Sequence, residues 1–391
     1  MPASFPQATP RRRGTGRHPA HREHKDTEDH LARQANPVDF WRGFALIAIF
    51  VNHIPGIYYE HFTHRNYAIS DAADLFVFLA GWSLRLAVGR PEDPTPTSAV
   101  MLRLGNRALT IYAAQILIIS IAIAMLAASA RLLDNPLLLE WHNAAAVFYD
   151  PVNAHIGLVL LTHQLGYFDI LPLYVVLMMM APAFVLIHRY APDWLLPISL
   201  LIYLTTLIFR IQIPSWPTNG TWFFNPLAWQ LIFVLGFSMA REHGIGGWVR
   251  SNIKWIRLVS IPLVIYGALA VWFRWWPDPT QVPEPKLLFV ISKTYATPQR
   301  IISVLSLVAV FSMAYPTIAK LAPPLTRVLS LLGRNSLYVF CVGSLLSLAC
   351  QILRYVYKGN ILADTAMVVA GIAIMVLSAW LADKRERKRP A

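Results

Sequence analysis

Two ionisable side chains inside the first hydrophobic segment, Arg42 and His53, have a spacing that could support chemistry. Eleven steps of about 100° make three helical turns plus only ~20°, so in a helix both side chains lie on one face. The rise between them would be ~16.5 Å, about half of a ~30 Å hydrocarbon core. Charged groups at membrane depth are costly and usually line a cavity in which they act. The pair therefore predicts an anionic compound that enters near Arg42 and reacts near His53.

The second hydrophobic segment repeats this spacing with Asp74 and Arg85. If the two helix faces meet, they make a deep His53–Asp74 pair at one end and an Arg42–Arg85 pair at the other. A neutral histidine can take a proton from a hydroxyl that attacks a carbonyl, and a carboxylate can fix the tautomer of the ring. Arginine binds phosphate through bidentate contacts. The arrangement predicts an acyl thioester on a phosphorylated carrier, with its phosphates beside the arginines and its thioester beside the histidine.

Each of these residues also has a structural interpretation. Asp71 and Asp74 stand three residues apart at a helix start, where they could cap the helix and stabilise its dipole. Arg42 and Arg85 could be flanking residues whose charged ends reach the membrane surface. His53 could be a hydrogen-bonded packing residue.

The composition predicts an all-α polytopic integral membrane bundle. Of the 391 residues, 56% are hydrophobic and only 14% are charged, against about 25% charged residues in soluble proteins. Cys341 and Cys350 would lie ~13 Å apart on one helix, too far for a disulfide, and no metal site is expected. Apolar runs predict ten spans, at 39–59, 69–89, 107–130, 166–187, 193–211, 226–241, 254–274, 299–320, 333–351 and 362–382.

The distribution of basic residues predicts the topology. Lysine and arginine gather in the terminal tails and in alternate loops, which is the positive-inside pattern and places both termini in the cytoplasm. The net charge of +13 therefore gives no reason to expect nucleic acid as a partner. We expect a basic, disordered cytoplasmic tail at 1–37, a transmembrane domain at 38–383 and a short basic cytoplasmic tail at 384–391.

The loops on the opposite side are rich in aromatic residues. These side chains could anchor the protein at the membrane interface, or they could form a platform for sugar rings, and the two roles are compatible. They are Tyr58, Tyr59, Trp141, Phe148, Tyr149, Trp216, Trp222, Trp275 and Trp276.

Several stretches resemble one known family, the OpgC succinyltransferases of osmoregulated periplasmic glucans in the bacterial inner membrane. The resemblance covers nearly all of residues 38–382, and the family is related to the acyltransferase-three membrane proteins, whose hallmark is an Arg or Lys, ten residues and a His in the first span. The stretches that carry it are VDFWRGFAL at 38–46, IFVNHIPG at 49–56, SDAADLFVFLAG at 70–81, HQLGYFDILP at 163–172, FNPLAWQ at 224–230 and GRNSLYVF at 333–340.

The resemblance implies a multi-pass inner-membrane enzyme that moves an acyl group from cytoplasmic acyl-CoA, such as succinyl-CoA, to a hydroxyl of a periplasmic glucan. By the family motif His53 is catalytic and Arg42 acts on the donor side. Asp71 and Asp74 carry over as motif members, and we favour Asp74 as the partner of His53. The expected partners are membrane lipid, the glucan and the acyl-CoA, and the sequence leaves a homodimer open.

Further candidates belong to the two ends of the bundle. Around the donor we expect Arg85, Arg103, Arg107, Arg334 and Asn335. On the outer side, residues that could hold the glucan or a succinyl carboxylate are Arg65, Asn66, His163, Gln164 and Lys293. His163 could instead be an interfacial hydrogen-bonding residue, and Asp169 could form a structural pair with an arginine or a tyrosine.

Two other function classes remain open at this stage. One is a transporter or flippase for a polysaccharide precursor or an anion, in which buried histidine and aspartate relay protons. The other is a non-enzymatic membrane partner in glucan assembly. A carrier usually distributes its ionisable residues along a pathway, whereas here the strongest signals converge on the first two segments.

Overall fold

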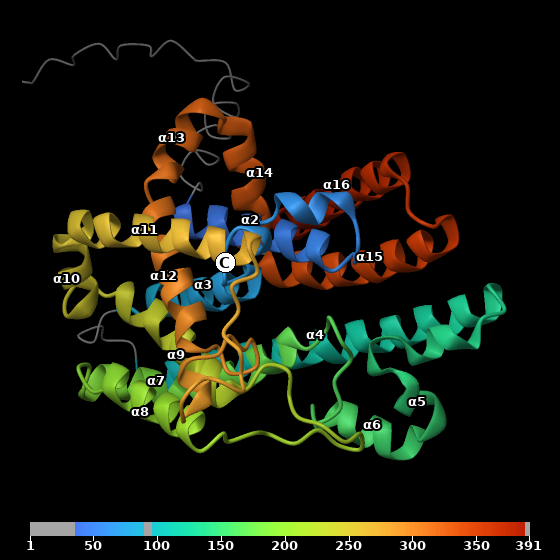
Figure 1. Cartoon of the computed structure of the whole chain (residues 1–391), viewed down its shortest axis with the longest axis horizontal. Coiled ribbons are helices and arrows are strands. Elements are labelled where there is room, and N and C mark those ends of the chain that lie inside the picture. The colour runs from blue at the N-terminus through green and yellow to red at the C-terminus, as the bar shows by residue number, and fades with distance from the viewer. Residues whose placement is uncertain (1–35, 90–95, 388–391) are drawn as a thin grey trace, which may run out of the picture.

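The computed structural model describes residues 36–89 and 96–387, and the regular elements of that part are helices (Figure 1). Five helices are long and apolar enough to cross a membrane: α4 (Thr97–Leu132), α7 (Ile170–Tyr190), α11 (Ile253–Trp272), α15 (Ser336–Tyr357) and α16 (Ile361–Arg387). A sixth would be the pair α12 (Pro298–Phe311) and α13 (Ala314–Leu321), whose axes are bent by 48°. The predicted all-helical membrane class is confirmed, while ten spans and cytoplasmic termini stay predictions.

Each of the ten predicted segments contains a helix, but four of these helices are short: α2 (Pro37–Asn52), α3 (Ala72–Ala87), α8 (Leu195–Ile208) and α9 (Pro226–Met239). The first predicted segment, 39–59, loses its α-helix at Asn52. Pro55 cannot continue a helix, because it lacks an N–H and its ring would meet the carbonyl one turn back. Gly56 then adopts a positive φ of 73°, and the chain continues as the 3₁₀-helix η1 (Tyr58–Phe62).

Some helices were not expected from the sequence. The most consequential is α14 (Pro323–Arg334), which replaces the predicted loop after the eighth segment and begins on prolines, residues that suit the first turn of a helix. The other short elements are η2 (His64–Asn66), η3 (Pro136–Asn143), α5 (Ala145–Tyr149), α6 (Pro151–Val159), α10 (Ile245–Ser251) and η4 (Lys286–Leu288). Helix α16 continues to Arg387, beyond the boundary expected at 383, whereas residues 1–35 and 388–391 of the predicted tails lie outside the described residues.

Two glycine-mediated crossings fix the central helices α2 and α3. At Gly43 and Gly333, where α2 crosses α14, an added Cβ atom would lie 1.8–2.0 Å from a backbone carbonyl oxygen of the other helix. Gly81 and Gly236 make the same kind of contact between α3 and α9, at 1.8 and 1.9 Å. Small residues allow helix backbones to approach closely in a membrane, where apolar surfaces alone give little driving force. The two helices that carry the main candidate residues are therefore held against rigid neighbours.

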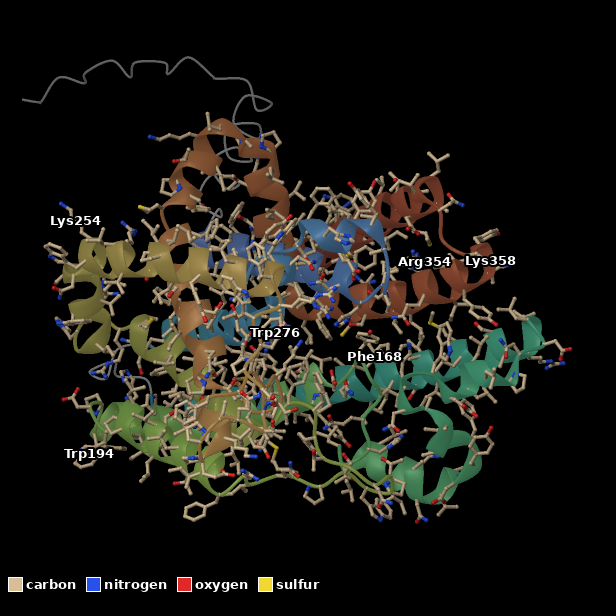
Figure 2. All side chains as sticks on the ribbon, in the orientation of Figure 1. Phe168, Trp194, Lys254, Trp276, Arg354 and Lys358 are labelled. Carbon is tan, nitrogen blue, oxygen red and sulfur yellow. The ribbon has the colours of Figure 1, made fainter. Side chains whose placement is uncertain are left out.

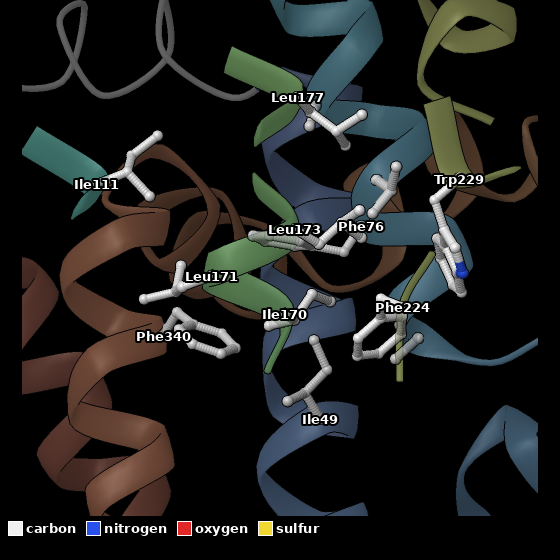
Figure 3. Packing of buried hydrophobic residues seen from close by; sticks show 14 of the residues in the cluster. Ile49, Phe76, Ile111, Ile170, Leu171, Leu173, Leu177, Phe224, Trp229 and Phe340 are labelled. Atoms are coloured by element: carbon white, nitrogen blue, oxygen red, sulfur yellow. The ribbon is translucent and has the colours of Figure 1, made fainter. Parts of the chain in front are cut away.

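The core beneath the candidate residues is built from apolar and aromatic side chains of several helices. Figure 3 shows Ile49 of α2, Ile170 and Leu171 of α7, and Phe224 grouped around the beginning of α7. The wholly buried Trp229 donates its Nε1–H to the backbone carbonyl of Lys293, at 2.9 Å. The segment before α12 is not helical at Lys293, so this hydrogen bond from the core helps to hold it in place.

Candidate active-site cavity

A cavity of about 680 Å³ opens at the His53 end of α2. Its walls come from the end of α2, the start of α3, the residues leading into α7 and the segment before α12. Five residues predicted from the sequence line it, namely His53, Arg65, Asn66, Asp71 and Lys293. The structure therefore brings the deep histidine, one of the two candidate acids and three of the outer-side candidates to one space.

His53 is the C-cap residue of α2, and its position is set by its backbone. Its N–H donates to the carbonyl of Ile49, at 3.0 Å, and its own carbonyl accepts a hydrogen bond from the side chain of Gln351. Its ring centroid lies 4.7 Å from that of Tyr167. The buried Nδ1 atom has no hydrogen-bond partner among the described residues. The ring is thus held by the chain and by an aromatic neighbour, and no carboxylate of residues 36–89 or 96–387 is hydrogen-bonded to it.

The predicted pair between His53 and Asp74 is wrong. The wholly buried Asp74 accepts a hydrogen bond at Oδ2 from the N–H of Asp71, at 2.8 Å, and pairs at the same atom with Arg300. Asp71 in turn accepts at Oδ1 from the N–H of Ala73, at 2.9 Å, so the two acids form a capping box at the start of α3. The capping interpretation is confirmed for both residues. Asp74 turns toward the helix terminus and Arg300 because both offer donors to its carboxylate.

Asp71 differs from Asp74 because it also faces the cavity, where it belongs to a cluster of four charges. Lys293 Nζ lies 2.7 Å and Arg300 Nη2 lies 3.2 Å from Asp71 Oδ2. Arg300, whose side chain is only 7% exposed, also binds Asp74 and donates from Nη1 to the carbonyl of Ile69, at 3.1 Å. Two carboxylates and two cations balance, which is the condition under which buried charges are tolerated. One wall of the cavity is therefore polar but close to neutral.

The lining residues that were not among the predicted site residues include Arg300, Tyr167 and Asp169. Arg300 carried a usable signal, since it is an ionisable residue near the start of an apolar helix. Tyr167 carried none, because aromatic residues are common at these positions. Asp169 was expected to pair with an arginine or a tyrosine, but within the described part of the chain it makes no such ion pair or hydrogen bond and instead lines the cavity.

The other outer-side candidates lie elsewhere. His163 is buried, with 2% of its surface exposed, and does not line the cavity. Gln164 donates its side-chain N–H to the carbonyl of Leu161, at 3.1 Å, so it stabilises its own loop. Their neighbour Gly166 does reach the cavity wall. The motif at 163–172 therefore contributes to the site through Gly166, Tyr167, Asp169 and Ile170, and not through its first two side chains.

The opposite end of α2 is arranged differently. Arg42 donates from Nη1 to the carbonyl of Gly333, at 3.1 Å, bonds Ser83 Oγ through Nη2 and lies 3.5 Å from a carboxylate oxygen of Asp39. The adjoining end of α14 carries two more candidates, Arg334 and Asn335, of which Arg334 pairs with Asp383, at 3.0 Å, and Asn335 donates to the carbonyl of Leu331, at 3.1 Å. Three donor-side candidates are thus brought together, and each is bonded to protein atoms.

The predicted Arg42–Arg85 pair is not formed. Helix α3 presents Ser83 to Arg42, and Arg85 lies about 200° further around that helix. Arg85 is buried and bonds the carbonyl of Gly89 at the end of α3. Arg103 and Arg107 lie one turn apart on α4 and are exposed. Although Arg42/His53 and Asp74/Arg85 have the same spacing, Arg42 and Arg85 therefore do not face each other.

A bundle of apolar helices with a charged cavity at one end of its central helix pair defines a helical membrane protein with a buried polar site. The chain belongs to the OpgC protein family, whose model matches residues 33–387. No curated protein matches the chain. Family membership, predicted from the motifs, is confirmed and implies a function of the glucan-succinylating type in a bacterial membrane. The predicted relation to the acyltransferase-three proteins stays a prediction.

Proposed function

We propose that this protein transfers a succinyl or similar acyl group from cytoplasmic acyl-CoA to a hydroxyl of a periplasmic glucan, in the cavity beside His53. The observation that carries the proposal is the convergence of His53, Asp71 and Lys293 on one cavity of about 680 Å³ in a chain of the OpgC family. A cavity of this volume has the size of typical small-molecule sites. The family match gives no support to the transporter alternative.

In the proposed reaction His53 acts as general base. The glucan hydroxyl attacks the thioester carbonyl while the neutral imidazole takes the hydroxyl proton, so a C–O bond forms and a tetrahedral oxyanion appears. The intermediate then collapses, the C–S bond breaks, and the imidazolium returns the proton to the leaving thiolate. Lys293 lies on the wall, and the N–H groups of its ammonium that do not bind Asp71 donate to the oxyanion.

The cavity also contains a cation that suits the free carboxylate of a succinyl group. Arg65 is exposed, lines the cavity and makes no ion pair with any described residue. Lys293 and Arg300, in contrast, are already matched by Asp71 and Asp74. An added anion would therefore bind best near Arg65, where the guanidinium can make bidentate contacts with a carboxylate.

For the donor we propose that the phosphates of the acyl-CoA approach the basic end of α2. Arg42, Arg334 and Asn335 gather there, and the exposed Arg103 and Arg107 lie on α4, which follows α3 in the chain. Arg42 would exchange its bonds to Ser83 and Gly333 for phosphate oxygens, which are better acceptors because they are charged. The thioester would reach His53 only if it traversed about half of the bilayer core.

The test is mass spectrometry of periplasmic glucans from cells that carry the wild type, His53→Gln or His155→Gln. His155 is exposed and is the matched control. We expect His53→Gln to abolish acyl substitution and His155→Gln to leave it unchanged, at equal protein levels in the membrane. Normal substitution in the His53→Gln cells would overturn the proposal.

A further inference from the structure

A second cavity, of about 460 Å³, adjoins the first. Tyr167 lines both cavities, so the two spaces meet at one side chain. Its ring lies between two histidines, 4.7 Å from the ring of His53 and 5.1 Å from that of His142. Figure 2 shows Arg354, one of the lining residues, toward the end of α15. The other lining residues are Pro55, Trp141, Gln351 and Tyr355.

The walls of this second cavity combine aromatic faces with hydrogen-bonding groups. Trp141 and Tyr355 stand nearly perpendicular, with ring centroids 5.8 Å apart and an angle of 86° between the rings. Tyr355 is half exposed, and its hydroxyl accepts a hydrogen bond from Asn135. Aromatic side chains with an apolar face and a polar edge suit ligands of the same mixed character, such as sugar rings with apolar C–H faces and peripheral hydroxyls.

The polar groups of this cavity are uncharged or already paired. Gln351 donates its Nε2–H to the carbonyl of His53, so its Oε1 accepts from His142 Nε2, at 2.6 Å. Burial lowers the pKa of His142 below its usual range despite this hydrogen bond, and the neutral ring keeps Nδ1 as an acceptor. Arg354 binds the carbonyls of Pro55 and Gly56, at 2.6 and 2.5 Å, and Asp364, at 3.0 Å. The cavity thus offers little to a phosphate and more to a neutral hydroxylated ligand.

The backbone around this cavity is strained. His142, Asn143 and Tyr167 have positive φ values of 56°, 64° and 67°, although none is glycine. Such conformations are uncommon for residues other than glycine and cluster at binding and catalytic sites. The N–H of Gly166 binds the carbonyl of His142, at 2.8 Å, which ties the two strained segments together. This backbone geometry places the ring of Tyr167 against the rings of both His53 and His142.

We propose that this second cavity binds a neutral sugar unit of the acceptor that neighbours the unit being acylated. The inference rests on the proposed function for the identity of the acceptor as a glucan and for the acylation of the unit in the first cavity. Tyr167 forms the boundary between the two units, and Trp141 provides the stacking face. The acceptor then makes contacts over at least two sugar units, so a glucose oligomer binds more tightly than glucose itself.

The experiment measures binding of glucose and of linear β-linked glucose oligomers of two to six units to the purified full-length protein in lipid nanodiscs, by calorimetry. The variants are Trp141→Ala and, as a matched control, Trp194→Ala, which changes an exposed tryptophan in the distant α7–α8 region (Figure 2). We expect the wild type and Trp194→Ala to bind oligomers about 10-fold more tightly than glucose. Trp141→Ala should lose this advantage and keep the affinity for glucose.

Three results would overturn the second subsite: no oligomer binding by the wild type, an equal loss of glucose and oligomer affinity in Trp141→Ala, or a retained oligomer advantage in that variant. Acyl transfer from acyl-CoA to the same oligomers separates this inference from the proposed function. A Trp141-dependent oligomer advantage without any acyl transfer would contradict the proposed function alone. Acyl transfer with the same KM for oligomers in the wild type and Trp141→Ala would contradict the second subsite alone.

Discussion

The two ends of helix α2 carry ionisable residues on one face, but they are built for different tasks. At the His53 end, charged and aromatic side chains surround a cavity, and one buried histidine nitrogen has no partner among the described residues. At the Arg42 end, α2 and α14 pack backbone to backbone at Gly43 and Gly333, and the guanidinium of Arg42 is bonded to Ser83 and Gly333. The spacing of two residues on one helix thus shows that their side chains share a face. Whether each side chain lines a cavity or packs against protein depends on the neighbouring helices.

Among the tests of this comparison, we expect the largest effect from substitution of Arg300, which binds both Asp71 and Asp74 in the polar wall of the first cavity. Arg300→Met leaves the buried Asp74 without its cation, and removal of one partner of a buried pair costs about 3–5 kcal/mol in the free energy of unfolding. The matched control is Arg210→Met, because Arg210 pairs with Glu284 at the exposed surface. That change should cost no more than about 1 kcal/mol. Equal losses for both variants, measured by thermal unfolding in detergent, would contradict the assigned cluster.

The next effect distinguishes the two acids. Asp71→Asn keeps a side chain that can cap α3 but removes the charge that faces the cavity, so we expect acyl transfer to fall by about 10–100-fold with the fold intact. Asp74→Asn should lower stability more than it lowers transfer, because Asp74 lies behind the wall. Transfer rates and unfolding midpoints of both variants decide between them. The reverse pattern would restore Asp74 as the carboxylate that acts together with His53.

A smaller effect tests the close packing at the Arg42 end. Gly333→Ala places a Cβ atom 1.8 Å from a carbonyl oxygen of α2, so the helices must separate at a cost of about 1–3 kcal/mol. Gly105→Ala in α4 is the control, since an added Cβ there meets no atom within 4 Å. It should be neutral or stabilise by up to about 1 kcal/mol. Wild-type stability in Gly333→Ala would show that the two helices are not held this closely.

The smallest effect concerns the role of Arg42 itself. Arg42→Lys keeps the charge and loses the forked contacts, so we expect KM for acyl-CoA to rise by about 3–10-fold with kcat unchanged. Arg131→Lys, at the exposed far end of α4, should change neither constant. If Arg42→Lys lowers the unfolding midpoint but leaves KM untouched, Arg42 holds helices together and does not bind the donor.

Much of the helical framework could be predicted from apolar runs, because each run long enough to bury itself in lipid contains a helix in the structure. The early end of α2 follows from Pro55, and the capping box of α3 follows from the spacing of Asp71 and Asp74. These features depend on neighbours within a few residues. Helix α14 escaped prediction because its mixed polar and apolar pattern is that of an amphipathic helix and not of a membrane span.

The contacts that complete the cavity could not be predicted in the same way. Arg300 binds Asp74 across 226 positions of sequence, and no local pattern shows that it competes with His53 for that acid. The position of Tyr167 depends on an unusual backbone angle and on packing between two histidines. The sequence therefore supplied the residue types, such as His53, Asp71 and Lys293, while the pairing among them required the three-dimensional arrangement.

The most direct test of the account is acyl transfer by the purified protein in proteoliposomes, from radiolabelled succinyl-CoA to a glucose oligomer. We expect His155→Gln to transfer at the wild-type rate and His53→Gln to be slower by about 10²–10⁴-fold, the usual contribution of a general base. Retention of the wild-type rate by His53→Gln, in correctly folded protein, would contradict the claim that chemistry occurs at the His53 end of α2.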